Sequence, residues 1–411
     1  MQYKEININL TDDEIAIKNN VHKFAIEVLR PASIELDKLS PENVIKKDSI
    51  FWSTLKQAYA MGLHTFLLPE SYGGLGLSPL AVHIVEEELA YGSIDFAVAL
   101  GVATFPAFIS MLAPTDYLIE NFIYPYTKDK EAKFIGCWAI TQPNRGSDTL
   151  AAGTDQFKDP NIKGEIAAKL DGNEWLVNGT TSAWVSCGTI ATHAAVFLNI
   201  DPSMGMAGGG ICIIPTDLSG VSKGKPLNKM GQRALNQGEI IFDNVRVPKD
   251  NMIIDQEAYE AMTDITLAAA NGSMGAFLTG VARAAYEEAL NYARQRVQGG
   301  KLLIEHEFIR HKLLHMFKLV EAARAFSRNV LVYNLTNSPP DTKYSIASKI
   351  FCTEAAFKVA NEASMIFGGY GVAKEYYVEK LLRDARASLI EDGSNDSLAI
   401  FAGELIEKSE E

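Results

Sequence analysis

The segment IEDGS, close to the carboxyl end of the chain, carries two adjacent carboxylates, Glu391 and Asp392, followed by Gly393 and Ser394. A positioned carboxylate can act as a general base that removes a proton from a substrate. Asp and Ser side chains in front of a helix more often accept hydrogen bonds from its first backbone N–H groups. Taken alone, the segment therefore indicates a helix cap by Asp392 or Ser394, with proton abstraction as the second interpretation.

A second polar segment, QPNRGSD, follows an apolar run and contains Pro143, Gly146, Ser147 and Asp148. These residue types favour a tight turn that presents backbone N–H groups and a hydroxyl, and such a concavity suits a pyrophosphate. An ordinary β-turn explains the same residues. The sequence alone leaves both interpretations open.

The segment TTSAWVSCG (180–188) predicts a strand on which Trp184 and Ser186 share one face, because strand side chains alternate. A tryptophan in the hydrophobic core is the simplest interpretation of Trp184.

Metal sites and common nucleotide motifs find little support. His306, His311 and His315 lie close together, but no carboxylate completes a HExxH pattern, so we expect a mixed-polarity helix face and no metal. No GxGxxG is present. The scattered cysteines form no CxxC pair and predict buried, reduced thiols of a cytosolic protein, with neither disulfides nor zinc. They are Cys137, Cys187, Cys212 and Cys352.

The elements that would position these residues follow an α–β–α order. Apolar residues recur at helical spacing over 12–128, short runs rich in β-branched residues fill 134–247, and long helical patterns follow Pro248. A Gly-rich loop, LPESYGGLGLS, interrupts the first part at 68–78. We therefore predict an α+β protein with domains at 1–132, 133–249 and 250–411.

Composition excludes several classes of function. The 411 residues are 47% apolar and 22% charged, as in soluble globular proteins, and the net charge of −13 opposes binding to nucleic acid or anionic membranes. The polar amino terminus predicts no signal peptide, hence a cytoplasmic protein. The uncharged stretch 96–115 contains Pro106 and is expected to form a buried helix pair broken there.

Six segments in register resemble signatures of the acyl-CoA dehydrogenase family. They are PESYGGLGLS, QPNRGSD, NGTTSAWVS, MGQRALNQGEIIFDNVRVP, ARQRVQGGKLLIEHE, and GGYGVAKEYYVEKLLRDA followed by IEDGS. The resemblance covers nearly the whole chain. It implies an amino-terminal α-helical domain, a middle β-barrel, a carboxy-terminal four-helix bundle, and FAD held at a subunit interface of a homodimer or homotetramer.

Carried over to this chain, the resemblance implies a complete flavin site. Ser147 would bind the pyrophosphate, and Ser186 would hydrogen-bond flavin N5 beside Trp184. From a neighbouring subunit, Arg296 would reach the pyrophosphate. The implied cofactor-binding residues are Ile140, Thr141, Ser147, Trp184, Val185, Ser186, Arg296, Glu307, Met365, Gly369, Ser394 and Asp396. Three positions depart from the family pattern, namely Gly299 for a bulky aromatic and Glu307 and Met365 for glutamines.

The chemistry-bearing positions also depart from the family. The base is usually the glutamate of a YEGT motif, which aligns with Asp392, and an arginine near the substrate is replaced by Asn271. The implied substrate-binding residues are Ser147, Asn271 and Gly393. One fewer methylene moves the carboxylate by about 1 Å, a shift that can cost on the order of 100-fold in rate.

The leading hypothesis is FAD-dependent α,β-dehydrogenation of an acyl-CoA or similar thioester. Asp392 would remove the α-proton, a hydride would pass to flavin N5, and an electron-transferring flavoprotein would accept the electrons. The altered base leaves two alternatives open. One is an oxidase of the nitroalkane-oxidase type that uses Asp392, and the other is an inactive FAD-binding scaffold.

Overall fold

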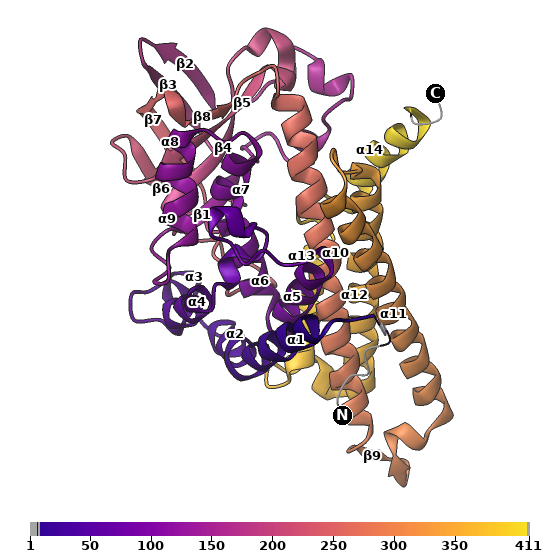
Figure 1. The fold of residues 1–411 in the computed structure, drawn as a ribbon. Helices are drawn as coiled ribbons and strands as arrows, with labels where there is room; N and C mark the ends of the chain where they lie inside the picture. The colour runs from indigo at the N-terminus through magenta and orange to yellow at the C-terminus, as the bar shows by residue number, and fades with distance from the viewer. Residues whose placement is uncertain (1–5, 7–8, 409–411) are drawn as a thin grey trace.

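A computed structural model describes residue 6 and residues 9–408, in three successive parts (Figure 1). The first part is helical. Its helices are α1 Asp12–Phe24, α2 Arg30–Leu36, α3 Pro41–Val44, α4 Ile50–Ala60, α5 Pro79–Gly92, α6 Ile94–Ala103, α7 Phe105–Leu112, α8 Asp116–Leu118 and α9 Tyr124–Thr127. Thr11 begins α1 with a capping box, in which its side chain and that of Glu14 bond each other's backbone N–H groups.

The apolar stretch around Pro106 forms two helices, as predicted. The chain passes from α6 to α7 at Thr104, and Pro106 lies in the first turn of α7, where its missing N–H is harmless. By length and composition, Ile94–Leu112 and Tyr259–Ala293 could each cross a membrane. In this fold 83% and 89% of their most apolar windows are buried within the protein, as in core helices.

The middle part is a β-sheet of eight strands within the described residues, paired in the order β6-β7-β3-β2-β4-β5-β8, with β1 beside β4. Its strands are β1 Gly136–Ala139, β2 Ala167–Asp171, β3 Glu174–Thr180, β4 His193–Asn199, β5 Gly209–Pro215, β6 Val221–Lys223, β7 Ile240–Pro248 and β8 Met252–Ile254. The long apolar runs in β4 and β5 reflect nearly complete burial of both strands.

The strand predicted over 180–188 is wrong. Strand β3 ends at Thr180, and the chain then turns, because Cys187 has a φ of 62° and the N–H of Gly188 bonds back to the carbonyl of Val185. Ser186 forms only an isolated bridge to Gln237. Ile140 and Thr141 likewise lie just beyond the end of β1.

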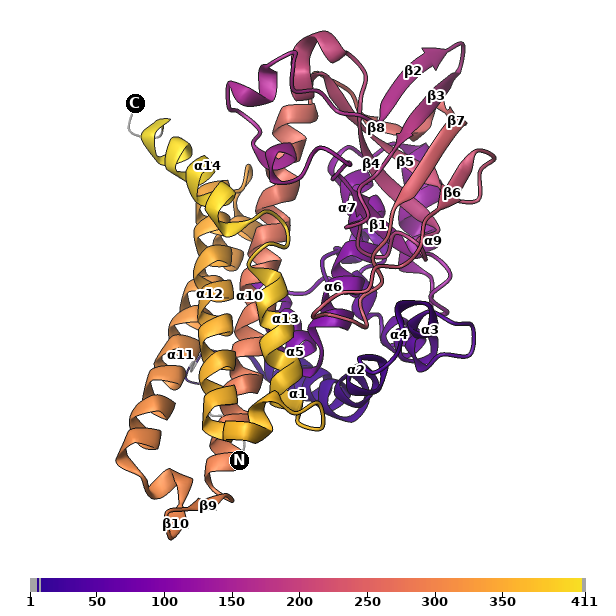
Figure 2. The same cartoon turned by 180° about the vertical axis from the view of Figure 1, so that it is seen from behind.

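The last part is a helical bundle built around α10 Tyr259–Ala293. Its other helices are α11 Glu307–Thr336, α12 Thr342–Phe367, α13 Tyr377–Ser388 and α14 Asn395–Lys408, and a small hairpin, β9 Val297–Gln298 and β10 Lys301–Leu302, follows α10. Figures 1 and 2 show α10 running between the first helices and α11 and α12. Helix α10 is buried on most sides, which explains its weak amphipathic pattern.

Helices α5 and α10 approach each other closely. A Cβ at Gly280 of α10 would lie 2.2 Å from the backbone oxygen of Glu87 on α5, so only glycine fits there. Buried ion pairs reinforce this contact, since Arg283 on α10 bonds Glu87 at 2.8 Å and Glu88 at 2.7 Å. The first helical part and the bundle therefore share one packed interface.

The histidines and cysteines, for which the sequence predicts no metal site, lie on α11 and in the core. His311 and His315 lie one turn apart on the surface of α11, with tilted rings whose centroids are 4.4 Å apart. Within the described residues no three His, Cys, Asp or Glu side chains form a group that could hold a metal ion. All four cysteines are buried and free.

Candidate active site

A cavity of about 900 Å³ opens where the sheet meets the bundle. Its walls come from the end of β1, the QPNRGSD turn, the turn after β3, the loop before β7, and the end of α13 with the segment that follows. Figure 2 shows α13 on the side of the bundle that faces the sheet. Among the residues proposed from sequence, those lining this cavity are Ile140, Thr141, Ser147, Trp184, Ser186, Asp392 and Gly393.

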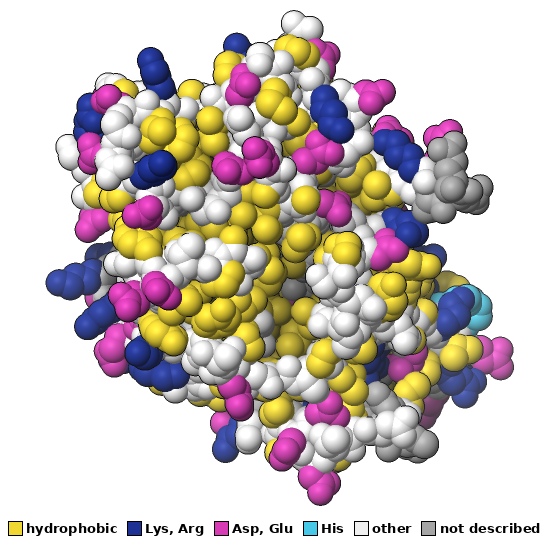
Figure 3. Space-filling view, turned by 45° about the horizontal axis from the view of Figure 1, so that its top comes forward, with side chains coloured by type: hydrophobic (Ala, Val, Ile, Leu, Met, Phe, Trp, Pro, Cys, Tyr) yellow, Lys and Arg dark blue, Asp and Glu magenta, His cyan; other side chains and the backbone are white. Residues whose placement is uncertain are grey.

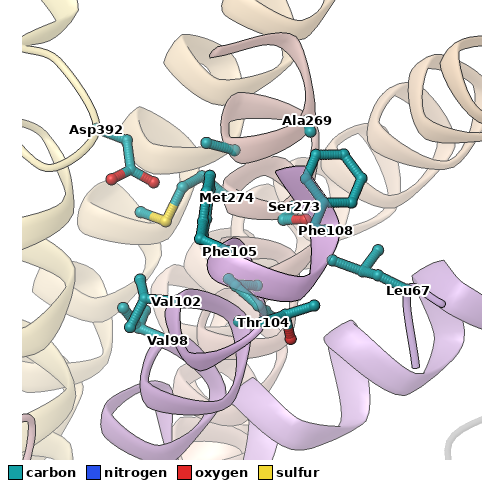
Figure 4. A pocket seen from close by; sticks show the side chains of 13 residues that line it. Leu67, Val98, Val102, Thr104, Phe105, Phe108, Ala269, Ser273, Met274 and Asp392 are labelled. Carbon is teal, nitrogen blue, oxygen red and sulfur yellow. The ribbon is translucent and has the colours of Figure 1, made fainter. Parts of the chain in front are cut away.

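A much smaller pocket of about 30 Å³ lies between α6, α7 and α10. Its wall is mainly apolar, and Figure 4 shows the residues that form it. They are Leu67, Val98, Gly101, Val102, Thr104, Phe105, Phe108, Ala269, Ala270, Ser273, Met274, Phe277 and Asp392. This volume has room for only a few atoms. In Figure 3 hydrophobic side chains gather around a hollow in the middle of the face, with most charged side chains at its margin.

Asp392 lines both the large cavity and the small pocket. Its neighbour Glu391 lines only the large cavity, where its carboxylate accepts a hydrogen bond of 2.6 Å from Gln232. The two adjacent carboxylates thus have different surroundings. Of the two carboxylates, only Asp392 borders both spaces, a position that it shares with the apolar Val102.

Two helices hold the backbone around Asp392. Asn271 on α10 donates a hydrogen bond of 3.1 Å to the carbonyl of Asp392, and Lys349 on α12 donates one of 2.7 Å to the carbonyl of Gly393. Lys349 also bonds Asn395 at 2.7 Å. These donors support an unusual backbone, because Asp392 has a φ of 51°, in the left-handed region that few residues other than glycine adopt.

Burial raises the pKa of Asp392 to about 6, although the nearby Lys349 ammonium acts in the opposite direction. Burial and the charge of Asp392 raise the pKa of Glu391 to about 7. Burial lowers the pKa of Lys349 to about 8. Both carboxylates therefore titrate close to neutral pH, which suits proton transfer.

The turn after β3 presents Trp184 and Ser186 to the large cavity. Trp184 is 62% exposed, so its interpretation as a core residue is wrong. The amide of Gln237 donates to the Ser186 hydroxyl at 3.0 Å and to the carbonyl of Trp184 at 3.2 Å. Val185, between them, is buried and lines neither space.

The QPNRGSD turn meets the segment after Asp392. The backbone N–H of Ser394 donates to the Ser147 hydroxyl at 3.0 Å, which joins the two segments. The Ser394 side chain caps α14 by accepting from the N–H of Ser397 at 3.3 Å, as one sequence interpretation predicted, whereas Asp392 makes no such cap. Asp396 is exposed in the first turn of α14.

Besides Val185, Ser394 and Asp396, four residues of the proposed flavin set do not line this cavity: Arg296, Glu307, Met365 and Gly369. They belong to the connection after α10, the start of α11 and the end of α12. The Arg296 guanidinium lies 5.7 Å from the ring centre of Tyr370, so this group gathers near the β9–β10 hairpin (Figure 2). Within one chain the proposed site is therefore divided between two places.

Sequence reasoning missed Lys349, Gln232 and Gln237. The signal for Lys349 was present, because it follows Ile346 by one turn and precedes Cys352 by another, on a face that is wholly buried. A lysine on the apolar face of a helix needs a buried acceptor. The two glutamines stand in an irregular loop, where no periodicity points to a cavity.

The structure thus consists of a helical part, a β-sheet and a helical bundle, with a cavity between the sheet and the bundle and carboxylates at its wall, as in an enzyme. Family models for the acyl-CoA dehydrogenase amino-terminal, middle and carboxy-terminal domains match residues 11–113, 137–245 and 261–404. The chain belongs to the acyl-CoA dehydrogenase family, whose members are flavoprotein oxidoreductases that use FAD.

Known proteins resemble the chain over almost its full length. The short-chain specific acyl-CoA dehydrogenase of Rattus norvegicus mitochondria is 28% identical over 404 residues, which cover 97% of this chain and 92% of the relative. The solved butyryl-CoA dehydrogenase of Megasphaera elsdenii has a TM-score of 0.86 at 26% identity, covering 98% of this chain and all of that one. A glutaryl-coenzyme A dehydrogenase in complex with glutaryl-CoA has a TM-score of 0.85 at 26% identity, covering 96% and 95%.

Proposed function

We propose that this chain binds FAD in the large cavity and catalyses α,β-dehydrogenation of a short acyl thioester, with Asp392 as the base. The observation that carries the proposal is the position of Asp392, which lines both the large cavity and the small apolar pocket. A reacting α-carbon between the two spaces would lie against this carboxylate. The small pocket would then hold the end of the acyl chain.

The residues of the large cavity fit a flavin. Small-molecule sites span roughly 300–1,000 Å³, and this cavity of about 900 Å³ lies near the upper limit, as a dinucleotide requires. The exposed Trp184 ring offers an apolar surface, and the buried indole N–H of Trp138 has no partner. When bound, FAD supplies a two-electron acceptor for the hydride that leaves the β-carbon.

Proton abstraction falls to Asp392. With a pKa near 6 the carboxylate is ionised at neutral pH, and the approach of an apolar acyl group raises its basicity by excluding water. Asn271 and Lys349 hold the adjacent carbonyls and so orient this carboxylate. The backbone N–H of Asp392 would stabilise the developing enolate oxygen.

The size of the pocket favours a short acyl chain. A volume of about 30 Å³ cannot accept a long alkyl chain without movement of α6 or α7. The names of two relatives, a short-chain specific acyl-CoA dehydrogenase and a butyryl-CoA dehydrogenase, agree with this size. We propose a CoA thioester as the substrate and an electron-transferring flavoprotein as the acceptor.

A homodimer or homotetramer would complete the flavin site. Arg296, Glu307, Met365 and Gly369 gather away from the cavity of their own chain. Large apolar side chains are exposed on the outer helices, which suits contact with a second copy. They include Phe308, Leu314 and Phe317 on α11, Met365 on α12 and Ile400 on α14.

Anaerobic mixing of the purified yellow protein with acyl-CoAs of increasing length tests the proposal. We expect butyryl-CoA to bleach the flavin and long-chain acyl-CoAs to react poorly. Absence of bleaching with every acyl-CoA, together with normal FAD content, would favour the inactive-scaffold alternative. Rapid reoxidation in air with release of peroxide would favour the oxidase alternative.

A further inference from the structure

Glu86 on α5 is the one member of a run of three glutamates without an ionic partner. Glu87 and Glu88 bond arginines of the bundle, but neither carboxylate oxygen of the fully buried Glu86 has a partner at hydrogen-bonding distance and angle. An unsatisfied buried polar group costs about 1–3 kcal/mol. Such a group in a native fold calls for an explanation by function or by a missing ligand.

The nearest polar neighbour of Glu86 belongs to the small pocket. The Ser273 hydroxyl lies close enough to Glu86 to favour its ionised form, without meeting the geometry of a full hydrogen bond, while burial raises the pKa of Glu86 to about 8. Ser273 itself lines the pocket, across from Asp392 (Figure 4). Ser273 and Glu86 lie on α10 and α5, the two helices that pack closely at Gly280.

Ser273 differs from the other hydroxyl of the pocket. Thr104 already donates to the backbone carbonyls of His64 and Leu100, at 3.0 and 3.1 Å. Ser273 makes no comparable backbone bond within the described structure. The pocket therefore has an apolar wall with a single available hydroxyl, and a carboxyl group stands behind it.

We propose that Ser273, positioned by Glu86, binds a neutral oxygen on the distal end of the acyl group, either a hydroxyl or a keto oxygen. This inference rests on the proposed function and specifies its substrate class. A neutral carboxyl can donate to Ser273, which leaves the serine O–H directed at an acceptor on the ligand. This chain of hydrogen bonds, from Glu86 to Ser273 and from Ser273 to the substrate, would give each of the three groups a hydrogen-bonding partner.

A charged end group fits less well. The cations next to α5 include Arg283 on α10 and Arg324 and Arg328 on α11, which pair with Glu87 or Glu88. Arg30 on α2 bonds the carbonyl of Tyr91 and pairs with Glu288. The remaining titratable neighbours, His22 on α1 and His83 on α5, contact Glu88 and Ser327. A carboxylate or ammonium would thus enter a small apolar pocket without a free counter-charge, which is costly.

Matched thioesters test the proposal. We compare the second-order rate constants for anaerobic flavin reduction by 4-hydroxybutyryl-CoA and valeryl-CoA, which differ only by a terminal hydroxyl in place of a methyl group. We expect the wild-type protein to prefer the hydroxyacyl substrate about tenfold or more, since a site built for a hydroxyl discriminates against its absence. Ser273→Ala and Glu86→Met should each lower this ratio at least about tenfold, mainly through weaker binding of the hydroxyacyl substrate and not through the limiting rate of reduction.

Controls separate positioning from structure. Glu86→Gln retains a hydrogen-bonding group of the same size and should restore most of the preference, whereas Ser110→Ala removes a buried hydroxyl outside both spaces and should leave the ratio unchanged. The inference would be overturned, and the proposed function would stand, if valeryl-CoA reduced the flavin at least as fast as 4-hydroxybutyryl-CoA and if Ser273→Ala left the ratio of the two rate constants unchanged. Failure of both thioesters to reduce the flavin would overturn the proposed function and the inference with it.

Discussion

At the scale of single residues, the adjacent carboxylates Glu391 and Asp392 differ in what they face. Asp392→Asn should lower flavin reduction by substrate at least about 100-fold, because a positioned base contributes that much or more. FAD content should stay normal, since the amide is nearly isosteric. Glu391→Gln should be mild, because Glu391 does not reach the small pocket. Stopped-flow measurement of the rate of flavin reduction in both variants tests this prediction. A larger loss of rate in Glu391→Gln than in Asp392→Asn would show that the base is Glu391.

The pH dependence of the reaction follows from the same residues. Asp392 must be ionised to accept a proton, and burial raises its pKa to about 6. The kcat/KM for flavin reduction should therefore fall about tenfold per pH unit below 6 and level off above it. Glu391→Gln should retain this inflection. An inflection near 7 that disappears in Glu391→Gln would instead assign the titration to Glu391, whose pKa is raised to about 7.

At the scale of elements, helix α12 holds the segment that carries the proposed base, Asp392, through the buried Lys349. Lys349→Met removes the donor to the Gly393 carbonyl and to Asn395, so we expect a loss of about 1–3 kcal/mol in the free energy of unfolding. Without this contact the segment can shift, and a displacement of Asp392 by about 1 Å should slow flavin reduction about 100-fold.

Lys358→Met provides the matched control for this change, since it removes an exposed lysine from the same helix. Thermal unfolding and anaerobic reduction should both remain near wild type in that variant. If the two substitutions had equal effects, the charge of α12 would determine the stability and the rate of flavin reduction, and the contact of Lys349 with the segment around Asp392 would not.

At the scale of the whole molecule, the proposed flavin-binding residues lie in two separate places on one chain, which predicts sites shared between two subunits. Arg296→Ala should weaken FAD retention even though Arg296 does not line the cavity of its own chain. Co-expression of Arg296→Ala and Asp392→Asn chains should restore activity, because one site of each mixed dimer has both residues intact. Random pairing into dimers would give about a quarter of the wild-type sites. Activity no greater than the sum of the separate variants would place the complete site within one chain.

Local sequence determined the kinds of element and several turns. Helical spacing and β-branched runs act over a few residues, so the α–β–α order could be predicted from them. The same reasoning wrongly predicted a strand at 180–188. The chain turns there at Cys187, and Trp184 is exposed at the cavity. Alternation alone could not show this, because the turn depends on bonds to the distant segment around Gln237.

The sequence by itself determined the family, because six segments in register match its signatures, and the resemblance aligned Asp392 with the position of the base. Only the tertiary structure decided that Asp392 stands between two spaces, that Asn271 and Lys349 hold its segment, and that Glu86 lies behind Ser273. Those relations join residues on different helices. They arise because burial leaves each polar group dependent on whichever partner the packing brings within reach.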